Sequence, residues 1–284
     1  MTRRNAILTL VLTGLATTWS ASRLPEASPG LMGVAAALCY VVAHGIRALR
    51  IVTLLGDRAR GFRAVLAAQF GTVAVSGMLP FKTGEVVRIL ALGAASRGPA
   101  HGLVAVWLER SFDALVWAVV GAAALFVVPE ARGAVGTVWA LALAFLFVTL
   151  ALVWVLPENL VAARRALVNR PTRPWIVPWL ARLAEAGAWS RLPRRLLDGR
   201  VGTLLVSTVA LWTMEAAALA FLIRSIEPGA ALGALLHVLA GVVIPTGGGF
   251  PPTDVLAAYA LVAMSCWHLL SLTALGSVLV WGSR

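Results

Sequence analysis

The sequence predicts an all-α protein, a polytopic bundle of transmembrane helices. Of its 284 residues, 60% are hydrophobic and only 13% are charged. Several uninterrupted apolar stretches approach the roughly 20 residues that a helix needs to cross a bilayer. No stretch is long and polar enough for a second, soluble domain, so residues 1–284 are expected to form a single integral membrane domain.

The formal net charge of +12 separates two classes of partner. In a soluble protein such an excess of basic residues indicates nucleic acid. In a membrane protein it is explained by arginine-rich loops on the cytoplasmic side, which face anionic lipid. We therefore expect no nucleic acid as a partner and expect membrane lipids instead.

The apolar stretches and the arginine asymmetry of the loops predict a multi-pass protein of the cell membrane with both termini in the cytoplasm. The first stretch, with two arginines before it, is expected to be an uncleaved span. The six expected spans cover residues 1–22, 31–55, 102–128, 134–156, 201–223 and 267–281.

One apolar stretch is interrupted by a proline and by charged residues. Residues 64–79 run to Pro80, and Lys82, Glu85 and Arg88 follow at once. Proline ends or kinks a helix because it lacks an N–H and clashes with the preceding turn. The returning arm, 85–95, is too short to cross a bilayer. The sequence therefore predicts a re-entrant helical hairpin that enters and leaves on the cytoplasmic side.

A similar interruption occurs late in the chain, where Ile244 and Pro245 lead to Asp254. The half 31–128 and the half 201–284 would cross the membrane in opposite directions, which predicts two hairpins related by an inverted repeat, as in many transporters. The alternative is two unrelated proline breaks. Between the halves, the arginine-rich stretch 157–200 has tryptophans and leucines at partly helical spacing, which predicts an amphipathic cytoplasmic helix.

Two motifs resemble a known family. Leu79-Pro80, then Gly84-Glu85-Val86-Val87-Arg88, then Glu109-Arg110 with Asp113, are similar to the motifs of the lysylphosphatidylglycerol synthase transmembrane region, also called the flippase-like integral membrane protein family. The resemblance covers the chain from about residue 31 onward. The second break departs from the family pattern, with Asp254 in place of glutamate and two additional prolines.

The resemblance implies a lipid flippase that moves an aminoacyl-phospholipid or a polyprenyl-phosphate-linked sugar across the cytoplasmic membrane. A lipid-modifying synthetase or a glycosyltransferase is the expected protein partner, and a homo-oligomer stays open. The alternatives are an intramembrane transferase acting on lipid headgroups and a membrane protein that anchors a lipid synthetase without transporting. Because there is no Ser-His or Cys-His arrangement and no acidic metal motif, we expect neither enzyme activity nor a cofactor.

Ionisable residues within the membrane are the candidates for substrate binding. They comprise Lys82, Glu85, Arg88, Glu109, Arg110, Asp113, Glu215 and Asp254, and Gly84 is a further candidate without a charge. Gly84 allows close backbone approach beside a helix N-terminus, which favours anions.

These candidates do not all carry the same expectation. Lys82 and Arg88 are expected to contact the headgroup, in a cavity between the hairpins with Glu85 and Asp254, so that Arg88→Ala would stop transport and leave the fold intact. For Glu109, Arg110 and Asp113, structural ion pairing is the favoured interpretation. Glu215 can carry a proton, contact a cation or pair with an arginine.

Overall fold

The computed structural model describes residues 11, 30–78, 83–127, 132–168 and 176–226. These residues form helices and short connections, and no strand occurs among them, which confirms the all-α class. Helices α2 (Gly30–Leu55), α5 (Pro99–Val127) and α10 (Val201–Ile226) coincide with three predicted spans to within three residues. The predicted spans 1–22 and 267–281, and the second break with Asp254, lie outside the described residues.

Three helices in the described part of the chain are long and apolar enough to cross a membrane: Gly33–Arg58, Val135–Ala166 and Val201–Phe221. Helix α5 has 29 residues, about 44 Å at 1.5 Å per residue, and is long enough as well. It differs from the other three because it carries Glu109, Arg110 and Asp113 near its middle. The polytopic helical membrane class is therefore confirmed, and α5 is the helix that carries the charges.

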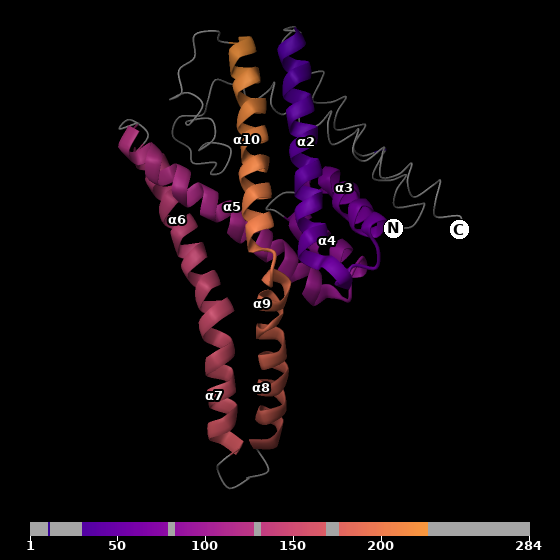
Figure 1. Cartoon of the computed structure of the whole chain (residues 1–284), viewed down its shortest axis with the longest axis vertical. Helices are drawn as coiled ribbons and strands as arrows, with labels where there is room; N and C mark the ends of the chain where they lie inside the picture. The colour runs from indigo at the N-terminus through magenta and orange to yellow at the C-terminus, as the bar shows by residue number, and fades with distance from the viewer. Residues whose placement is uncertain (1–10, 12–29, 79–82, 128–131, 169–175, 227–284) are drawn as a thin grey trace, which may run out of the picture.

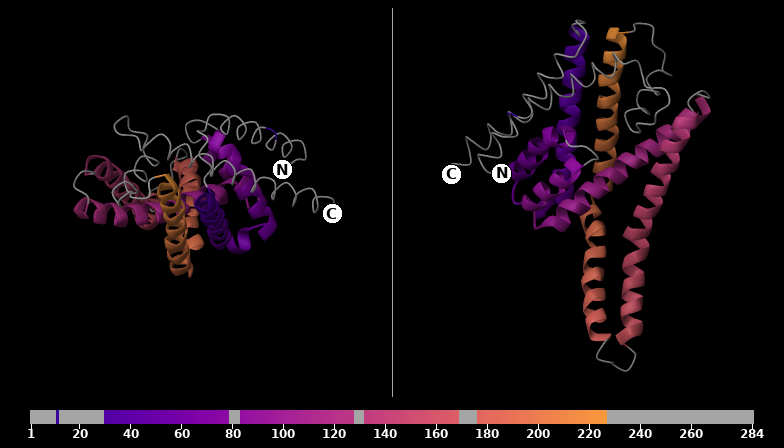
Figure 2. Two further views of the ribbon diagram at one scale, coloured as in Figure 1. Left: turned by 90° about the horizontal axis from the view of Figure 1, so that it is seen from above. Right: turned by 180° about the vertical axis from the view of Figure 1, so that it is seen from behind.

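Helices α2 and α10 lie side by side, and α5 crosses them obliquely (Figures 1 and 2). Helix α3 (Phe62–Met78) and helix α4 (Thr83–Ala94) lie together beside α2. The chain leaves α4 close to where it begins α3, since the Arg60 N–H donates to the Ala95 carbonyl at 2.9 Å and its Nε donates to the Ser96 carbonyl at 3.1 Å. The two helices are therefore antiparallel.

A hydrophobic core joins these helices at the end of the bundle where the basic loop 58–63 lies. It includes buried residues of α2, α3, α4, α5, α9 (Leu192–Leu197) and α10: Ile51, Leu54, Leu55, Val65, Leu92, Val104, Ala105, Leu108, Leu196 and Leu204. Gly56, with φ of +48°, ends α2 beneath the guanidinium of Arg200, which donates to the Leu54 carbonyl at 3.1 Å. The start of α10 is thereby held against the end of α2.

Two glycines allow α4 and α5 to cross at backbone contact. A Cβ on Gly102 would lie 2.3 Å from the Ile89 carbonyl oxygen and 2.6 Å from the Gly93 nitrogen. A Cβ on Gly93 would lie 2.7 Å from the Pro99 Cα. Small residues at helix crossings in membranes permit such close approach, so this crossing sets the position of α4, and of Glu85 and Arg88 on it, relative to α5.

We expect Gly102→Ala to destabilise the protein by about 1–3 kcal/mol, because the new methyl meets backbone atoms that cannot move aside. The matched control is Gly202→Ala on α10, where a Cβ meets nothing within 4 Å and where replacing helical glycine is neutral or stabilising. Thermal unfolding of the purified protein in detergent compares the two variants. Equal melting temperatures for both would contradict the close crossing of α4 and α5.

Helix α6 (Arg132–Leu150) does not end near Pro157, where the sequence predicts the fourth span to stop. It passes through a π-helical turn (Ala151–Val155) directly into α7 (Leu156–Val168). Pro157 has no N–H for the Val153 carbonyl, but Arg194 Nε donates to that oxygen at 2.8 Å and Nη2 donates to the Trp154 carbonyl at 2.7 Å. The helix continues because a distant arginine replaces the missing hydrogen bond.

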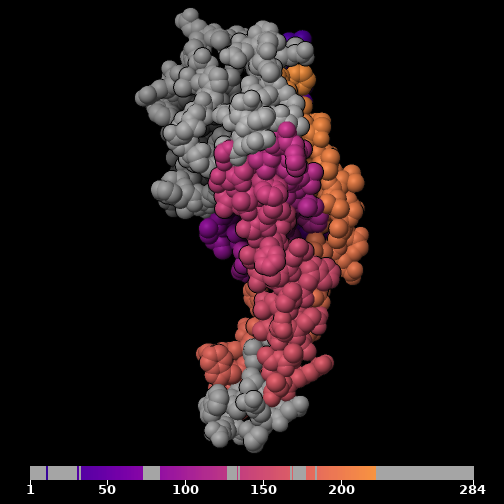
Figure 3. Space-filling model, turned by 90° about the vertical axis from the view of Figure 1, so that its left-hand side faces the viewer, coloured from indigo at the N-terminus to yellow at the C-terminus, as the bar shows by residue number. Residues whose placement is uncertain are grey.

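The stretch 157–200 also differs from the single amphipathic helix that the sequence predicts. It forms α7, then α8 (Ile176–Ser190), then the short α9. Helices α7 and α8 lie side by side and project beyond α2 and α10 as a narrow arm (Figures 1 and 3). The π turn and α7 continue the line of α6, and Arg194 on α9 also binds Glu158 on α7 at 2.9 Å. We call α7 and α8 the projecting arm.

Candidate functional site

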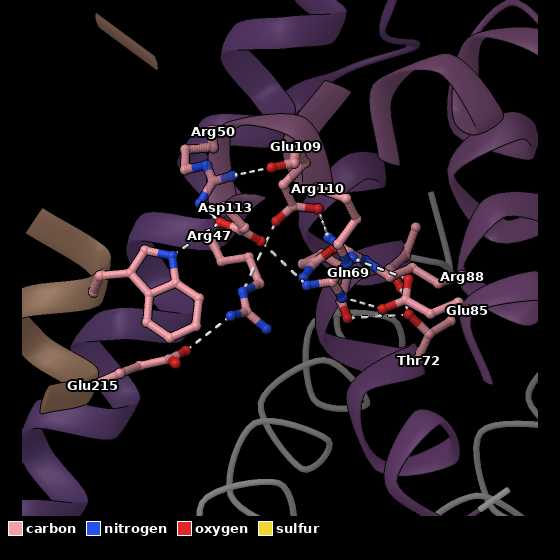
Figure 4. Close-up of polar contacts among 12 residues, drawn as sticks. Arg47, Arg50, Gln69, Thr72, Glu85, Arg88, Glu109, Arg110, Asp113 and Glu215 are labelled. Carbon is pink, nitrogen blue, oxygen red and sulfur yellow. Dashed lines mark hydrogen bonds and ion pairs between the residues drawn. The ribbon is translucent and has the colours of Figure 1, made fainter. Parts of the chain in front are cut away.

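The charged residues of the bundle meet in one network where α2, α4, α5 and α10 converge (Figure 4). Four arginines and four carboxylates take part, so the network has no net formal charge. They are Arg47, Arg50, Glu85, Arg88, Glu109, Arg110, Asp113 and Glu215. Ion pairing is required here, because an unpaired charge away from water costs several kcal/mol.

Glu109 and Asp113, four residues apart on α5, share one helix face and are the buried acceptors at the centre. Glu109 Oε2 accepts from Arg88 Nη2, and the Glu109 carbonyl accepts from Arg50 Nη2 at 2.8 Å. Asp113 Oδ1 accepts from Arg50 Nη1 at 2.8 Å, and its Oδ2 accepts from Arg110 Nη1 at 3.2 Å. These contacts bind α2 and α4 to α5.

Arg88 donates a hydrogen bond from each of its three guanidinium nitrogens. Its Nε donates to Gln69 Oε1 of α3 at 2.8 Å, its Nη1 to Glu85 Oε2 at 3.2 Å, and its Nη2 to Glu109. Only 5% of its side chain is exposed. Arg50 is likewise fully buried. Both guanidinium groups therefore join helices together and have little freedom to turn toward a ligand.

Arg110 and Arg47 are more accessible. Arg110 lies 36% exposed and pairs with Glu85 and Asp113. Arg47 lies 16% exposed, and its Nη2 donates to Glu215 Oε1 of α10 at 2.8 Å. Arg47 Nε is 3.8 Å from Glu109 Oε1, too far for a hydrogen bond. Among the residues that the structure describes, Arg47 therefore has a single hydrogen-bonded partner, in contrast to Arg88.

Several buried polar atoms of the described residues near this site have no hydrogen-bond partner. They are Arg47 Nε, Arg50 Nε, Glu109 Oε1 and both ring nitrogens of His44. His44 precedes Arg47 by three residues on α2, and its ring packs edge-on against Tyr40 with centroids 4.6 Å apart. Unsatisfied buried groups are costly, so this side of the network has unused hydrogen-bonding capacity.

Helix α10 reaches the network through two side chains that lie one turn apart. Glu215 binds Arg47, and Trp212 Nε1 donates to Asp113 Oδ1 at 3.3 Å. The Trp212 ring also packs edge-on against Trp117 of α5, with centroids 4.9 Å apart. These contacts connect the second half of the chain to charges that belong to the first half.

The structure brings together six of the predicted site residues: Glu85, Arg88, Glu109, Arg110, Asp113 and Glu215. Gly84 is buried in the first turn of α4, beside Glu85. Lys82 and Asp254 lie outside the described residues, and so does the predicted cavity between two hairpins. Of the three alternatives for Glu215, the structure shows pairing with an arginine across the bundle.

Sequence analysis missed four residues of the network: Arg47, Arg50, Gln69 and Trp212. Arg47 and Arg50 lie near the end of the predicted span 31–55, where arginines also mark the cytoplasmic side. A signal for a deeper position is present, because five further residues, four of them apolar, follow Arg50 before α2 ends at Leu55. By helix geometry Arg50 lies about 7.5 Å inside the end of this apolar helix, whereas Gln69 and Trp212 carry no comparable signal.

No group of three or more histidine, cysteine, aspartate and glutamate side chains suited to a metal ion occurs in the part of the chain that the structure describes. The carboxylates of the network face arginines instead. The network therefore offers ionic interactions, between its own arginines and carboxylates or with a charged ligand.

Fold and site together define a polytopic helical membrane protein with a buried, neutral network of ion pairs. The model of one family, the lysylphosphatidylglycerol synthase TM region, matches residues 6–283, and the chain belongs to this family. Comparison with curated proteins and with solved structures finds no match. The family connects the protein to lipid synthesis or lipid flipping in a membrane.

Proposed function

We propose that the protein is a lipid flippase that carries a lipid with an anionic, phosphate-bearing headgroup across the membrane. An aminoacyl-phospholipid and a polyprenyl-phosphate-linked sugar both fit this description. The observation that carries the proposal is a network of four arginines inside the bundle. One of them, Arg47, has a single hydrogen-bonded partner and an unsatisfied Nε among the described residues.

A headgroup that crosses a membrane must exchange its water for other polar partners. A neutral network can supply these partners, because a phosphate oxygen can take the place of a carboxylate at an arginine. The arginine then stays paired throughout the exchange, and no buried cation is left without a partner. Arginine suits this exchange since its planar fork binds phosphate and carboxylate in the same geometry. Arg47 and Arg110 are the accessible arginines, so we assign them to the headgroup and assign Arg50 and Arg88 to structure.

The proposal includes the re-entrant hairpin. Helix α3 has 17 residues and α4 has 12, about 26 Å and 18 Å in length, and both are shorter than the roughly 30 Å hydrocarbon layer. Their return to a common end, through Arg60 and Ala95, supports entry and exit on one side. With the basic loops in the cytoplasm, both termini would be cytoplasmic. An inverted repeat would place the break at 245–254 opposite this hairpin.

The tails would remain in the bilayer while the headgroup follows the network. The second half contacts that network through Glu215 and Trp212. Rocking of one half against the other, as in inverted-repeat transporters, would open it to each side in turn. A lipid-modifying synthetase or a glycosyltransferase would supply the substrate on the cytoplasmic side.

Reconstitution into liposomes tests the proposal. Vesicles of phosphatidylcholine carry a trace of fluorescent phosphatidylglycerol or fluorescent phosphatidylcholine, and a membrane-impermeant quencher reports which leaflet holds the label. We expect the protein to accelerate equilibration of the anionic lipid well above that of the zwitterionic lipid and above protein-free vesicles. Acceleration of neither lipid, by protein shown to be monodisperse, would contradict transport of phospholipid and would leave the polyprenyl-phosphate lipids for the same assay.

A further inference from the structure

The projecting arm contains a basic cavity that the ion-pair network does not use. A cavity of about 390 Å³ lies between α7 and α8, within the usual size range of ligand sites. Its charged lining residues are Arg164 and Arg165 on α7 and Arg191, which directly follows α8. None of the described residues that line it is a carboxylate.

The spacing of the lining residues explains the shape of the cavity. Leu160, Arg164 and Val168 are four residues apart and share one face of α7. The opposite wall is the α8 face that carries Ala184 and Gly187. Because these two residues are small, and a Cβ at Gly187 would meet nothing within 4 Å, the helices enclose open space.

The side chains of the three arginines form no hydrogen bond or ion pair with any residue that the structure describes. Arg194 on α9, next to the arm, shows the contrast, because its three guanidinium nitrogens donate to Glu158 and to two backbone carbonyls. Arg182 on α8 lies outside the cavity, 5.5 Å from the Trp179 ring centroid. Thus Arg164, Arg165 and Arg191 form a set of free guanidinium groups that converge on one space.

We propose that this cavity is a binding site for the phosphate of an anionic amphiphile. Guanidinium groups bind phosphate with paired, charge-assisted hydrogen bonds. The apolar side chains of Leu160, Val161 and Val168 beside them suit a ligand with an apolar part. The site is separate from the ion-pair network and does not depend on transport. The bound phosphate can belong to a lipid headgroup or to a soluble phosphate ester.

Protection of arginines from phenylglyoxal, measured by mass spectrometry on the full chain in non-ionic detergent, tests the proposal. The probes are dihexanoyl-phosphatidylglycerol, glycerol phosphate and dihexanoyl-phosphatidylcholine. We expect the first to protect Arg164, Arg165 and Arg191 but not Arg182, and the zwitterionic lipid to protect none. Equal protection by glycerol phosphate identifies a soluble phosphate ester as the source. Protection by neither anion, or equal protection of Arg182, overturns the proposal.

Three variants separate the effect of the cavity from the effect of the overall charge of the arm. Arg191→Gln should raise the concentration of dihexanoyl-phosphatidylglycerol that protects Arg164 by about tenfold, the scale of a lost charged hydrogen bond. Arg182→Gln removes the same charge outside the cavity and should leave that concentration unchanged. Ala184→Leu fills the cavity without changing any charge and should also weaken protection. Equal effects of Arg191→Gln and Arg182→Gln would show general electrostatic attraction and overturn the site.

Discussion

Arg88→Ala is expected to destabilise the protein by about 3–5 kcal/mol, the usual cost of removing one partner of a buried ion pair. Glu109 has no exposed surface, and Arg88 supplies the hydrogen bond to its carboxylate oxygen Oε2. Gln69 Oε1 loses its donor as well. This expectation replaces the one drawn from the sequence, in which Arg88 contacts substrate and its removal leaves the fold intact.

Unfolding of purified variants in detergent measures the effect. Arg182→Ala, an exposed arginine on α8 beside Trp179, is the matched control and should cost at most about 1 kcal/mol. The double variant Arg88→Leu with Glu109→Leu should recover much of the loss, since replacing both partners by apolar groups is often nearly neutral. If Arg88→Ala melts at the temperature of the unmodified protein, Arg88 is not the structural arginine that its contacts indicate.

The positions of the helices could be predicted from the sequence because membrane spans are long and uniform in composition. The predicted span 31–55 is α2, and the two arms of the first break, 64–79 and 85–95, correspond to α3 and α4. Local signals were sufficient in each case, namely a continuous apolar run and the Leu79–Pro80 break. Family membership followed from two short motifs, and the family model confirms it over residues 6–283.

The prediction failed where a distant side chain decides the outcome. Pro157 ends a helix by every local rule, yet the chain continues because Arg194, 37 positions later, donates to the carbonyls of Val153 and Trp154. The π turn beside them is a further sign of an altered hydrogen-bond pattern. No local pattern in residues 150–160 indicates that partner.

Most residues of the candidate site could be predicted from the sequence, but not which of them hold the helices together and which are accessible to a ligand. Glu85, Arg88, Glu109, Arg110 and Asp113 follow from charge within apolar segments. The burial of each arginine depends on the packing of four helices against one another. This packing cannot be predicted from the local sequence. Arg47 is absent from the predicted site for the same reason, since its partner Glu215 lies 168 residues away.

Arg47→Gln is expected to reduce transfer of the anionic lipid at least tenfold and to destabilise the protein less than Arg88→Ala does, because the side chains of Arg47 and Glu215 are 16% and 15% exposed whereas Glu109 is fully buried. Among the described residues, the Arg47 guanidinium makes one hydrogen bond, from Nη2 to Glu215, and its buried Nε has no acceptor. Its loss therefore removes one structural contact together with an arginine that has donors left for a phosphate oxygen. Glutamine keeps a polar group, on a shorter side chain, without the charge or the fork.

Arg47→Lys should restore part of the rate, because lysine keeps the charge but cannot bind phosphate with two parallel hydrogen bonds.

Glu215→Gln tests whether the headgroup competes with Glu215 for Arg47 or whether the Arg47–Glu215 pair serves only the fold. If the headgroup displaces Glu215 from Arg47, removing the carboxylate's charge should strengthen lipid binding and slow release, so that transfer saturates at lower lipid concentration and at a lower maximal rate. Thr213→Ala, an exposed change two positions away on α10, should alter neither the lipid concentration at which transfer saturates nor the maximal rate. Leaflet transfer in liposomes and melting temperature are measured on the same preparations. Full transfer by well-folded Arg47→Gln protein would remove Arg47 from the headgroup path and leave Arg110 as the remaining accessible arginine of the network.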